Sequence, residues 1–300
     1  MDKPKVIVIC GPTASGKTAL SIQLAKQING EIISGDSMQI YKKMNIGTAK
    51  PTLEEMQGIK HYLLDFVEPN QRYSVAEFKK DAEEAIIKIL EKGKVPIIVG
   101  GTGLYIDSLI YGIEYKNIEF DEEYRKELEK RVETEGLEVL YNEAKKIDSK
   151  AIEKISNNDK KRILRILEIY KATGKNKTEQ EIESRKNEVK YDYKVFAIGM
   201  EREKLYERIN MRVDIMIQKG LIEEVENLLK EYNEFPTAMQ GLGYKEVVEY
   251  LNEQISKEEM IEKIKRETRR YAKRQLTWFR KNKQTNWIGP HDLQKILNEI

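Results

Sequence analysis

A glycine-rich phosphate-binding motif near the start of the chain constrains the fold most strongly. Residues 11–18 have the form G-x-x-x-x-G-K-T, after an apolar run at 6–9 and before apolar residues at helical spacing. A strand, a loop and a helix in this order form the setting in which the motif holds phosphate. Gly11 and Gly16 allow backbone N–H groups to approach a ligand, and the helix N-terminus adds unpaired donors. A plain strand-to-helix turn is the weaker interpretation, because every fixed position of the motif is present.

The motif does not by itself identify the phosphate compound. Lys17 supplies a charge for phosphate oxygens, and the hydroxyl of Thr18 can bind Mg²⁺. A nucleoside triphosphate is the usual ligand, but a diphosphate on another carrier would fit the same loop. The apolar run at 95–99 is followed by Gly100, Gly101 and Thr102. An ATPase would place a magnesium-binding acid there, so its absence argues weakly against an ATPase or GTPase.

Short apolar runs alternate with helical patterns, which predicts a parallel α/β sheet flanked by helices. A capping-box pair, Ser74 and Glu77, starts a predicted helix that Gly93 ends, and Ser256 with Glu259 starts a long C-terminal helix. Further helices are predicted at 202–219 and 221–232. The predicted strands are 6–9, 31–37, 61–66, 95–99 and 195–199.

The segment from 116 to 190 differs from the rest of the chain. It has dense charge and no convincing strand pattern, and its clearest feature is a predicted helix at 158–170. We therefore expect an all-helical insertion at 116–190 in a core built from 1–115 and 191–300. In open parallel sheets, ligands bind beyond the carboxyl ends of the strands. The phosphate loop, Asp36 and Thr102 are all expected at that edge.

Asp36 and Thr102 are the first candidates for chemistry. Asp36 follows the second predicted strand, where an acid beside a phosphate loop can act as a metal ligand or a general base. The alternative is a helix N-cap. Thr102 lies in a glycine-rich turn before another helical pattern, and an N-cap explains it equally well.

Two basic segments are candidates for binding anions. Lys204, Arg208 and Arg212 recur every four residues, so they share one helix face that could grip a phosphate group or simply be solvated. From Lys263 to Lys283 there are ten bases and one acid, with aromatic residues between them. This composition is typical of a nucleic-acid surface, although Trp278 and Phe279 are expected to be core contacts.

The overall composition excludes several classes of protein. The formal net charge is only +2, and Cys10 is the single cysteine, so an intramolecular disulfide and a zinc site of several thiolates are excluded. We expect Cys10 to be buried and inert. His61 and His291 have no metal-ligand spacing. With no signal-peptide pattern and no apolar stretch of about eighteen residues, we expect a soluble cytoplasmic protein without membrane association.

Five blocks of the sequence together closely resemble the tRNA dimethylallyltransferase family, also called tRNA isopentenyltransferases. They follow the family's order, cover nearly the whole chain, and lie at 11–18, 36–41, 100–105, 240–246 and 271–279. The resemblance implies transfer of the dimethylallyl group from dimethylallyl diphosphate to the N6 amine of an adenine in tRNA. That adenine lies immediately 3′ of the anticodon in tRNAs that read codons beginning with U, and the product is N6-isopentenyladenosine.

The resemblance also implies roles for individual residues. Asp36 is the expected general base for the adenine amine, with Thr102 in contact with the adenine. Either Arg208 or Arg212 is expected on the diphosphate, and Mg²⁺ is the expected cofactor, with Thr18 as its protein ligand. The expected diphosphate site is Gly11, Thr13, Ala14, Ser15, Gly16, Lys17 and Thr18.

The expected tRNA contacts, all to the anticodon stem-loop, are spread along the chain. Gln39 is expected to read the edge of the target nucleotide, and Lys161 stands where the family often has Gln. The protein is expected to be a monomer. The full set is Asp36, Ser37, Met38, Gln39, Thr102, Arg125, Lys161, Arg162, Ile163, Leu164, Arg165, Arg269, Arg270, Lys273 and Arg274.

Two other functions are compatible with the phosphate loop. An adenylate isopentenyltransferase would use the same donor with a free nucleotide, but it would not need the helical insertion or the basic terminal helix. A small-molecule kinase or nucleotide switch would use ATP or GTP and ignore a prenyl diphosphate.

Overall fold

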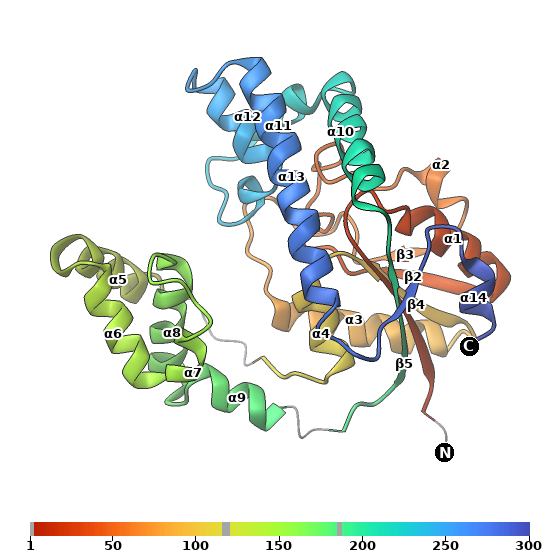
Figure 1. Cartoon of the computed structure of the whole chain (residues 1–300), viewed down its shortest axis with the longest axis horizontal. Coiled ribbons are helices and arrows are strands. Elements are labelled where there is room, and N and C mark those ends of the chain that lie inside the picture. Colours follow the sequence, from red (N-terminus) through yellow and green to blue (C-terminus); the bar gives the residue numbers. More distant parts are fainter. Residues whose placement is uncertain (1–2, 116–120, 185–187) are drawn as a thin grey trace. The chain divides into compact units, whose positions relative to one another are not determined.

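The chain forms two compact units in the computed structural model, which describes residues 3–115, 121–184 and 188–300 (Figure 1). The first unit comprises Met1–Asp107 and Lys190–Ile300, and the second comprises Ser108–Val189. The expected start of the insertion, residue 116, lies outside the described residues. The contacts instead change at Ser108, which lies within one continuous helix.

The first unit is built on a six-stranded sheet in which every neighbouring pair is parallel. The strand order is β3-β2-β4-β1-β5-β6, so the phosphate-loop strand lies inside the sheet. This confirms the predicted parallel α/β fold. The strands are β1 (Lys5–Cys10), β2 (Gly30–Ser34), β3 (His61–Tyr62), β4 (Val95–Gly100), β5 (Asp192–Ile198) and β6 (Asn286–Ile288).

The two shortest strands differ most from the prediction; in addition, β2 ends at Ser34 rather than at residue 37, and β5 begins at Asp192 rather than at residue 195. The strand expected at 61–66 ends at Tyr62, because Leu63 and Asp65 have φ values of 58° and 57° and cannot continue an extended strand. The edge strand β6 was not predicted, since three residues carry too little alternation to be recognised.

Helices cover the sheet, and most begin where the sequence predicted. Ser74 and Ser256 each form a complete capping box, with Glu77 and Glu259 respectively. Helix α3 packs on β2 and β4, and α10 packs on α13 (Figure 1). The helices that begin in this unit are α1 (Lys17–Gln27), α2 (Leu53–Met56), α3 (Val75–Leu90), α4 (Gly103–Ile110), α10 (Arg202–Gln218), α11 (Leu221–Glu231), α12 (Tyr244–Leu251), α13 (Lys257–Phe279) and α14 (Leu293–Leu297).

Two apolar clusters position the carboxyl edge of this sheet. One lies between the sheet and α1 and includes Ile7, Leu24 and Phe196. The other joins α11, α12 and α13 to the loop after β2, in which Tyr41 and Met44 are fully buried. The long loop from 35 to 50 is therefore an ordered part of the core, although it contains no helix or strand of its own.

The described residues of the second unit form helices joined by short loops, with no strand among them, and the unit has its own apolar core. The predicted helix at 158–170 appears as α8, shifted by two to three residues. Its apolar face packs on α5 and α6 through Leu128, Leu140, Ile163 and Leu164. The helices that lie wholly in this unit are α5 (Glu122–Glu135), α6 (Leu137–Ile147), α7 (Ser149–Ile152), α8 (Lys160–Thr173) and α9 (Lys177–Ser184).

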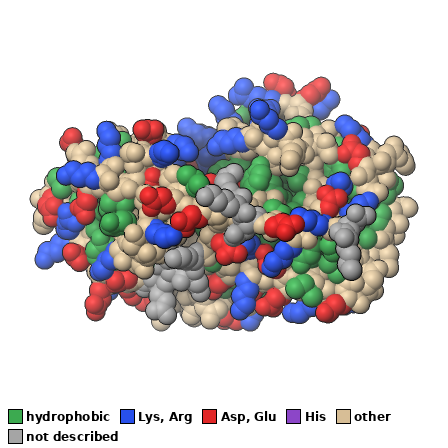
Figure 2. Space-filling model, turned by 90° about the horizontal axis from the view of Figure 1, so that it is seen from below, with side chains coloured by type: hydrophobic (Ala, Val, Ile, Leu, Met, Phe, Trp, Pro, Cys, Tyr) green, Lys and Arg blue, Asp and Glu red, His purple; other side chains and the backbone are tan. Residues whose placement is uncertain are grey.

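The distribution of charged side chains on the surface agrees with the small net charge of the chain. Acidic and basic side chains are interspersed over the face drawn in Figure 2. Among the helices at 3–115, 121–184 and 188–300, none is both long and apolar enough to cross a membrane.

Candidate active site

The phosphate loop joins β1 to α1 at the carboxyl edge of the sheet. Gly11 has a φ of +145°, and a Cβ there would lie 3.2 Å from the backbone of Ile198, so only glycine fits without displacement. Gly16 is the N-cap of α1 in the left-handed conformation, and no side chain caps that helix end. The unpaired N–H groups of this first turn form a site suited to an anion.

The interior of the loop holds a cation and an unpaired hydroxyl. The Nζ of Lys17 donates to the carbonyls of Gly11 at 3.0 Å and Pro12 at 2.7 Å. Burial, followed by the charge of Arg212, lowers the pKa of Lys17 to about 8, while Asp36 opposes this shift. The Oγ of Ser15 is buried without a hydrogen-bond partner among the described residues. The unpartnered hydroxyl of Ser15 and the buried ammonium group of Lys17 are both suited to bind the oxygens of a phosphate ligand.

Both candidate arginines reach the phosphate loop from α10. The Nε of Arg208 donates to the carbonyl of Ala14 at 2.8 Å, and Arg212 Nη1 lies 3.5 Å from the hydroxyl of Thr13. Burial and the neighbouring charge of Arg208 lower the pKa of Arg212. Lys204, one turn earlier, is exposed and pairs with Glu201 at 2.8 Å. The basic face is therefore divided between the site and solvent.

Asp36 begins a tight turn and does not cap a helix. Its Oδ1 accepts from the backbone N–H of Met38 at 2.8 Å and of Gln39 at 3.3 Å. The hydroxyl of Thr102 accepts from the N–H of Ser37 at 3.0 Å and donates to the Ser37 hydroxyl at 3.3 Å. The structure thus brings Thr102 and the turn after β2 together, as the sequence predicted.

The amide of Gln39 is fixed by the far end of its own loop. Its Nε2 donates to the carbonyls of Thr48 at 3.1 Å and Ala49 at 3.2 Å. Since both amide hydrogens are directed at carbonyls, the group that Gln39 can offer to a nucleotide is its Oε1 acceptor.

Helix α13 contributes two residues to which sequence reasoning assigned no role. Gln275 accepts from the backbone N–H of Thr13 at 2.9 Å and donates to the carbonyl of Gly101 at 2.9 Å. Burial, followed by the charge of Asp36, raises the pKa of Tyr271, while hydrogen bonds with Thr102 and Gln275 oppose that shift. The available signal was their four-residue spacing, which places both residues on one face of a helix that also carries many basic residues.

The remainder of α13 separates into a packed face and a charged face. Phe279 is buried, and Trp278 packs against Gly103 and donates to Asp107 at 2.9 Å, so both make the predicted core contacts. Arg269 donates to Asn210 at 2.6 Å and is half-buried. Three basic residues expected to contact tRNA are exposed: Arg270, Lys273 and Arg274.

The helical unit carries the other residues expected to contact tRNA. Arg125 and Arg165 both donate to the buried carboxylate of Glu168, at 2.8 and 3.1 Å. Lys161, Arg162 and Arg165 are exposed on α8.

Two of the expected contacts in this unit do not fit the structure. The side chains of Ile163 and Leu164 have exposed fractions of 0% because they fill the core of the helical unit. These two residues therefore serve packing in the family motif at 161–165. Their side chains cannot contact tRNA directly in this conformation.

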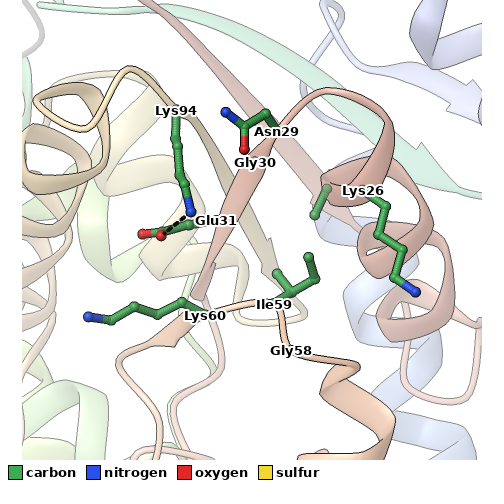
Figure 3. Close-up of a pocket in the computed structure, with 9 residues that line it drawn as sticks. Lys26, Asn29, Gly30, Glu31, Gly58, Ile59, Lys60 and Lys94 are labelled. Carbon is green, nitrogen blue, oxygen red and sulfur yellow. Dashed lines mark hydrogen bonds and ion pairs between the residues drawn. The ribbon is translucent and has the colours of Figure 1, made fainter.

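A pocket of about 310 Å³ lies away from this site, at the amino ends of β2 and β4. The Nζ of Lys94 pairs with Glu31 at 2.8 Å, whereas Lys26 and Lys60 point away from each other (Figure 3). Lys26 donates to the side chain of Gln57 at 2.6 Å, and the Nζ of Lys60 lies 4.9 Å from the ring centroid of Tyr62. All three lysines thus have partners within the protein, and the pocket takes no part in the site above.

The site fits a metal ion carried by a substrate phosphate. No group of three or more His, Cys, Asp or Glu side chains that could hold a metal occurs within the described ranges. Thr18 is exposed on the first turn of α1, beside the loop. Mg²⁺ commonly keeps several waters and binds through one or two protein groups together with substrate phosphates. The hydroxyl of Thr18, which lies next to the anion site of the phosphate loop, can serve as such a protein ligand.

Comparisons with known proteins agree with the motifs. Residues 39–282 match the family model described as IPP transferase. The chain is 53% identical over 299 residues to a tRNA dimethylallyltransferase of Acetivibrio thermocellus, covering 98% of this chain and 96% of the relative. It is 51% identical over 291 residues to one of Caldanaerobacter subterraneus, covering 96% and 92%.

Solved structures show the same fold. A tRNA isopentenylpyrophosphate transferase from Bacillus halodurans superposes with a TM-score of 0.74 at 42% identity, covering 99% of this chain and 95% of that one. A eukaryotic dimethylallyltransferase acting on tRNA superposes with a TM-score of 0.78 at 34% identity, covering 97% and 75%. On the sequence match and the shared fold, this chain belongs to the IPP transferase family.

Proposed function

We propose that the chain transfers a dimethylallyl group from dimethylallyl diphosphate to the N6 amine of the adenine immediately 3′ of the anticodon. The acceptors are tRNAs that read codons beginning with U, and the product is N6-isopentenyladenosine. One observation supports this most directly: the phosphate loop and the turn that holds Asp36 share one edge of the sheet. There Gln275 bonds Thr13 of the loop and the carbonyl of Gly101, and Thr102 bonds the turn at Ser37.

The arrangement suits the chemistry of the transfer. In the overall transfer the N6–C bond forms, the allylic C–O bond breaks and diphosphate leaves, and the N6 proton passes to Asp36. Lys17, the α1 N-terminus and the α10 arginines would stabilise the leaving diphosphate. Since Oδ1 of Asp36 already accepts two backbone N–H groups, Oδ2 is the oxygen placed to act as the base. Mg²⁺, held by Thr18 and the diphosphate, would neutralise charge on the leaving group.

Support for a tRNA acceptor comes from two sources. The relatives named above are tRNA-modifying enzymes by name. Helix α13 and helix α8 each expose a row of basic residues that a free adenine nucleotide would not require. A cytoplasmic, monomeric enzyme is part of this proposal.

The test is an incubation with radiolabelled dimethylallyl diphosphate, Mg²⁺ and two acceptors, AMP and unmodified tRNA reading codons that begin with U. We expect label on tRNA alone. Label on AMP would identify an adenylate isopentenyltransferase instead. ATP turnover with label on neither acceptor would identify a kinase-type enzyme.

A further inference from the structure

Glu224 on α11 binds a run of three consecutive backbone N–H groups. Its Oε2 accepts from Asn45 at 2.9 Å and Ile46 at 2.7 Å, and its Oε1 accepts from Gly47 at 3.1 Å. Successive N–H groups that converge on one carboxylate form a strong, charge-assisted anchor. The anchored residues belong to the loop after β2, which carries Asp36 and Gln39.

Tyr244 completes this anchor from α12. Its hydroxyl donates to Oε1 of Glu224 at 2.6 Å, so each carboxylate oxygen receives two donors. Its ring is fully buried and lies against Gly47, where a Cβ would come within 2.4 Å of the ring. This contact assigns a structural role to the sequence block at 240–246, for which the chemistry of the site suggested none.

The anchor and Gln39 are joined by a short stretch of backbone. Residues 45–47 are bound to Glu224, and the next two carbonyls, of Thr48 and Ala49, hold the side-chain amide of Gln39. The hydroxyl of Thr48 also donates to the carbonyl of Met44 at 2.6 Å, which closes the turn. A displacement of 45–47 would therefore displace the groups that orient Gln39.

We infer that Glu224, held by Tyr244, is a positioning residue for recognition of the target nucleotide. It fixes 45–49 so that Gln39 presents its Oε1 acceptor to the substrate base. The inference rests on the proposed function, because it assigns the loop to the target nucleotide. Glu224 itself would touch neither substrate nor the reacting atoms.

The variant that tests this is Glu224→Gln. A carboxamide offers one acceptor oxygen, so its NH₂ group must face at least one of the four donors. We expect kcat/KM for tRNA to fall roughly tenfold or more, the effect of leaving one such donor unsatisfied. The dissociation constant of dimethylallyl diphosphate should be unchanged, since the phosphate loop lies elsewhere. Glu223→Gln, an exposed neighbour on α11, is the matched control and should match wild type.

A double-mutant cycle separates positioning from general loss of stability. If Glu224 acts through Gln39, the fall in kcat/KM caused by Gln39→Ala should largely disappear in the Glu224→Gln background. Fully additive effects would overturn the inference. Hydrogen exchange gives a readout independent of activity: the amides of Ile46 and Gly47 should exchange faster in Glu224→Gln and also, to a lesser degree, in Tyr244→Phe. Unchanged exchange would overturn it as well.

The two hypotheses fail in different ways. A wild-type protein that modifies no tRNA would refute the proposed function. An active wild type in which Glu224→Gln behaves like Glu223→Gln would refute only the role of Glu224.

Discussion

Lys17 is the residue whose chemistry depends most clearly on its surroundings. Burial and Arg212 lower its pKa to about 8, so below that pH it is a cation and above it becomes neutral. A bound diphosphate favours the cation and raises this pKa. The dissociation constant of dimethylallyl diphosphate should therefore be flat below about pH 7 and rise above pH 8, by at most about tenfold per pH unit.

Calorimetric titration between pH 6.5 and 9.5 measures this dependence. Lys17→Arg is the matched variant, because arginine stays charged throughout the range and should remove the dependence, whatever its absolute affinity. The same rise in Lys17→Arg would assign the titration to another group.

Asp36→Asn tests the general base at the same scale. The carboxamide oxygen can still accept from Met38 and Gln39, so the turn and tRNA affinity should be preserved. Loss of the base should slow the single-turnover rate by about 10²–10⁴-fold. A rate within about tenfold of wild type would remove Asp36 from proton transfer.

Residues that could be predicted from the sequence are those with a local signal. The phosphate loop and Asp36 follow strands directly, so their position follows from the topology of a parallel sheet. Gln275 and Glu224 could not be assigned, because their partners lie far away in the chain and glutamine or glutamate on a helix is ordinarily solvated. Ile163 and Leu164 are the opposite case. Their place in a family motif led us to expect contact with tRNA, but their side chains are buried in the core of the helical unit.

At the scale of elements, α13 joins the phosphate site to a basic surface. Gln275 bonds the phosphate loop on one face, while Arg270, Lys273 and Arg274 are exposed on another. Replacing those three residues with Gln should weaken tRNA binding and reduce its salt dependence. The slope of log K against log salt should become shallower by about 0.7–0.9 for each tRNA phosphate that these side chains neutralise in the wild type.

Filter binding of tRNA from 50 to 300 mM salt checks this, with Lys88→Gln on α3 as an exposed control. Dimethylallyl diphosphate affinity should not change, since Gln275 is retained. A slope equal to that of wild type would place the tRNA backbone on other residues.

Elements were predictable where their start signals were strong. The capping boxes at Ser74 and Ser256 located the starts of α3 and α13 to the residue, whereas α3 ends at Leu90, before the expected stop at Gly93. Strand β6 and helix α14 were missed because each is too short to show a period, and they are held by the sheet edge and by α1 rather than by local preference. The secondary structure of such short segments is determined by tertiary contacts and not by the local sequence.

At the scale of the whole chain, the two units have separate apolar cores. Leu164 belongs to the helical unit, and Ile33 lies in β2; the exposed fraction of each side chain is 0%. Composition placed the insertion at 116–190, whereas the contacts divide the chain at Ser108 and Val189. A change in charge density shows where the exposed part of the insertion begins. It does not show the boundary at Ser108, because that boundary lies inside helix α4.

Separate cores predict separate local stabilities. Leu164→Ala and Ile33→Ala should each cost about 2–5 kcal/mol in the unit that contains the residue. Hydrogen exchange followed by mass spectrometry should show faster exchange in 121–184 for Leu164→Ala, and in the sheet unit for Ile33→Ala. Leu164→Ala should also keep the diphosphate affinity of wild type while kcat/KM for tRNA falls, because α8 carries exposed basic residues. Faster exchange in both units for either variant would mean that the chain unfolds as one cooperative body.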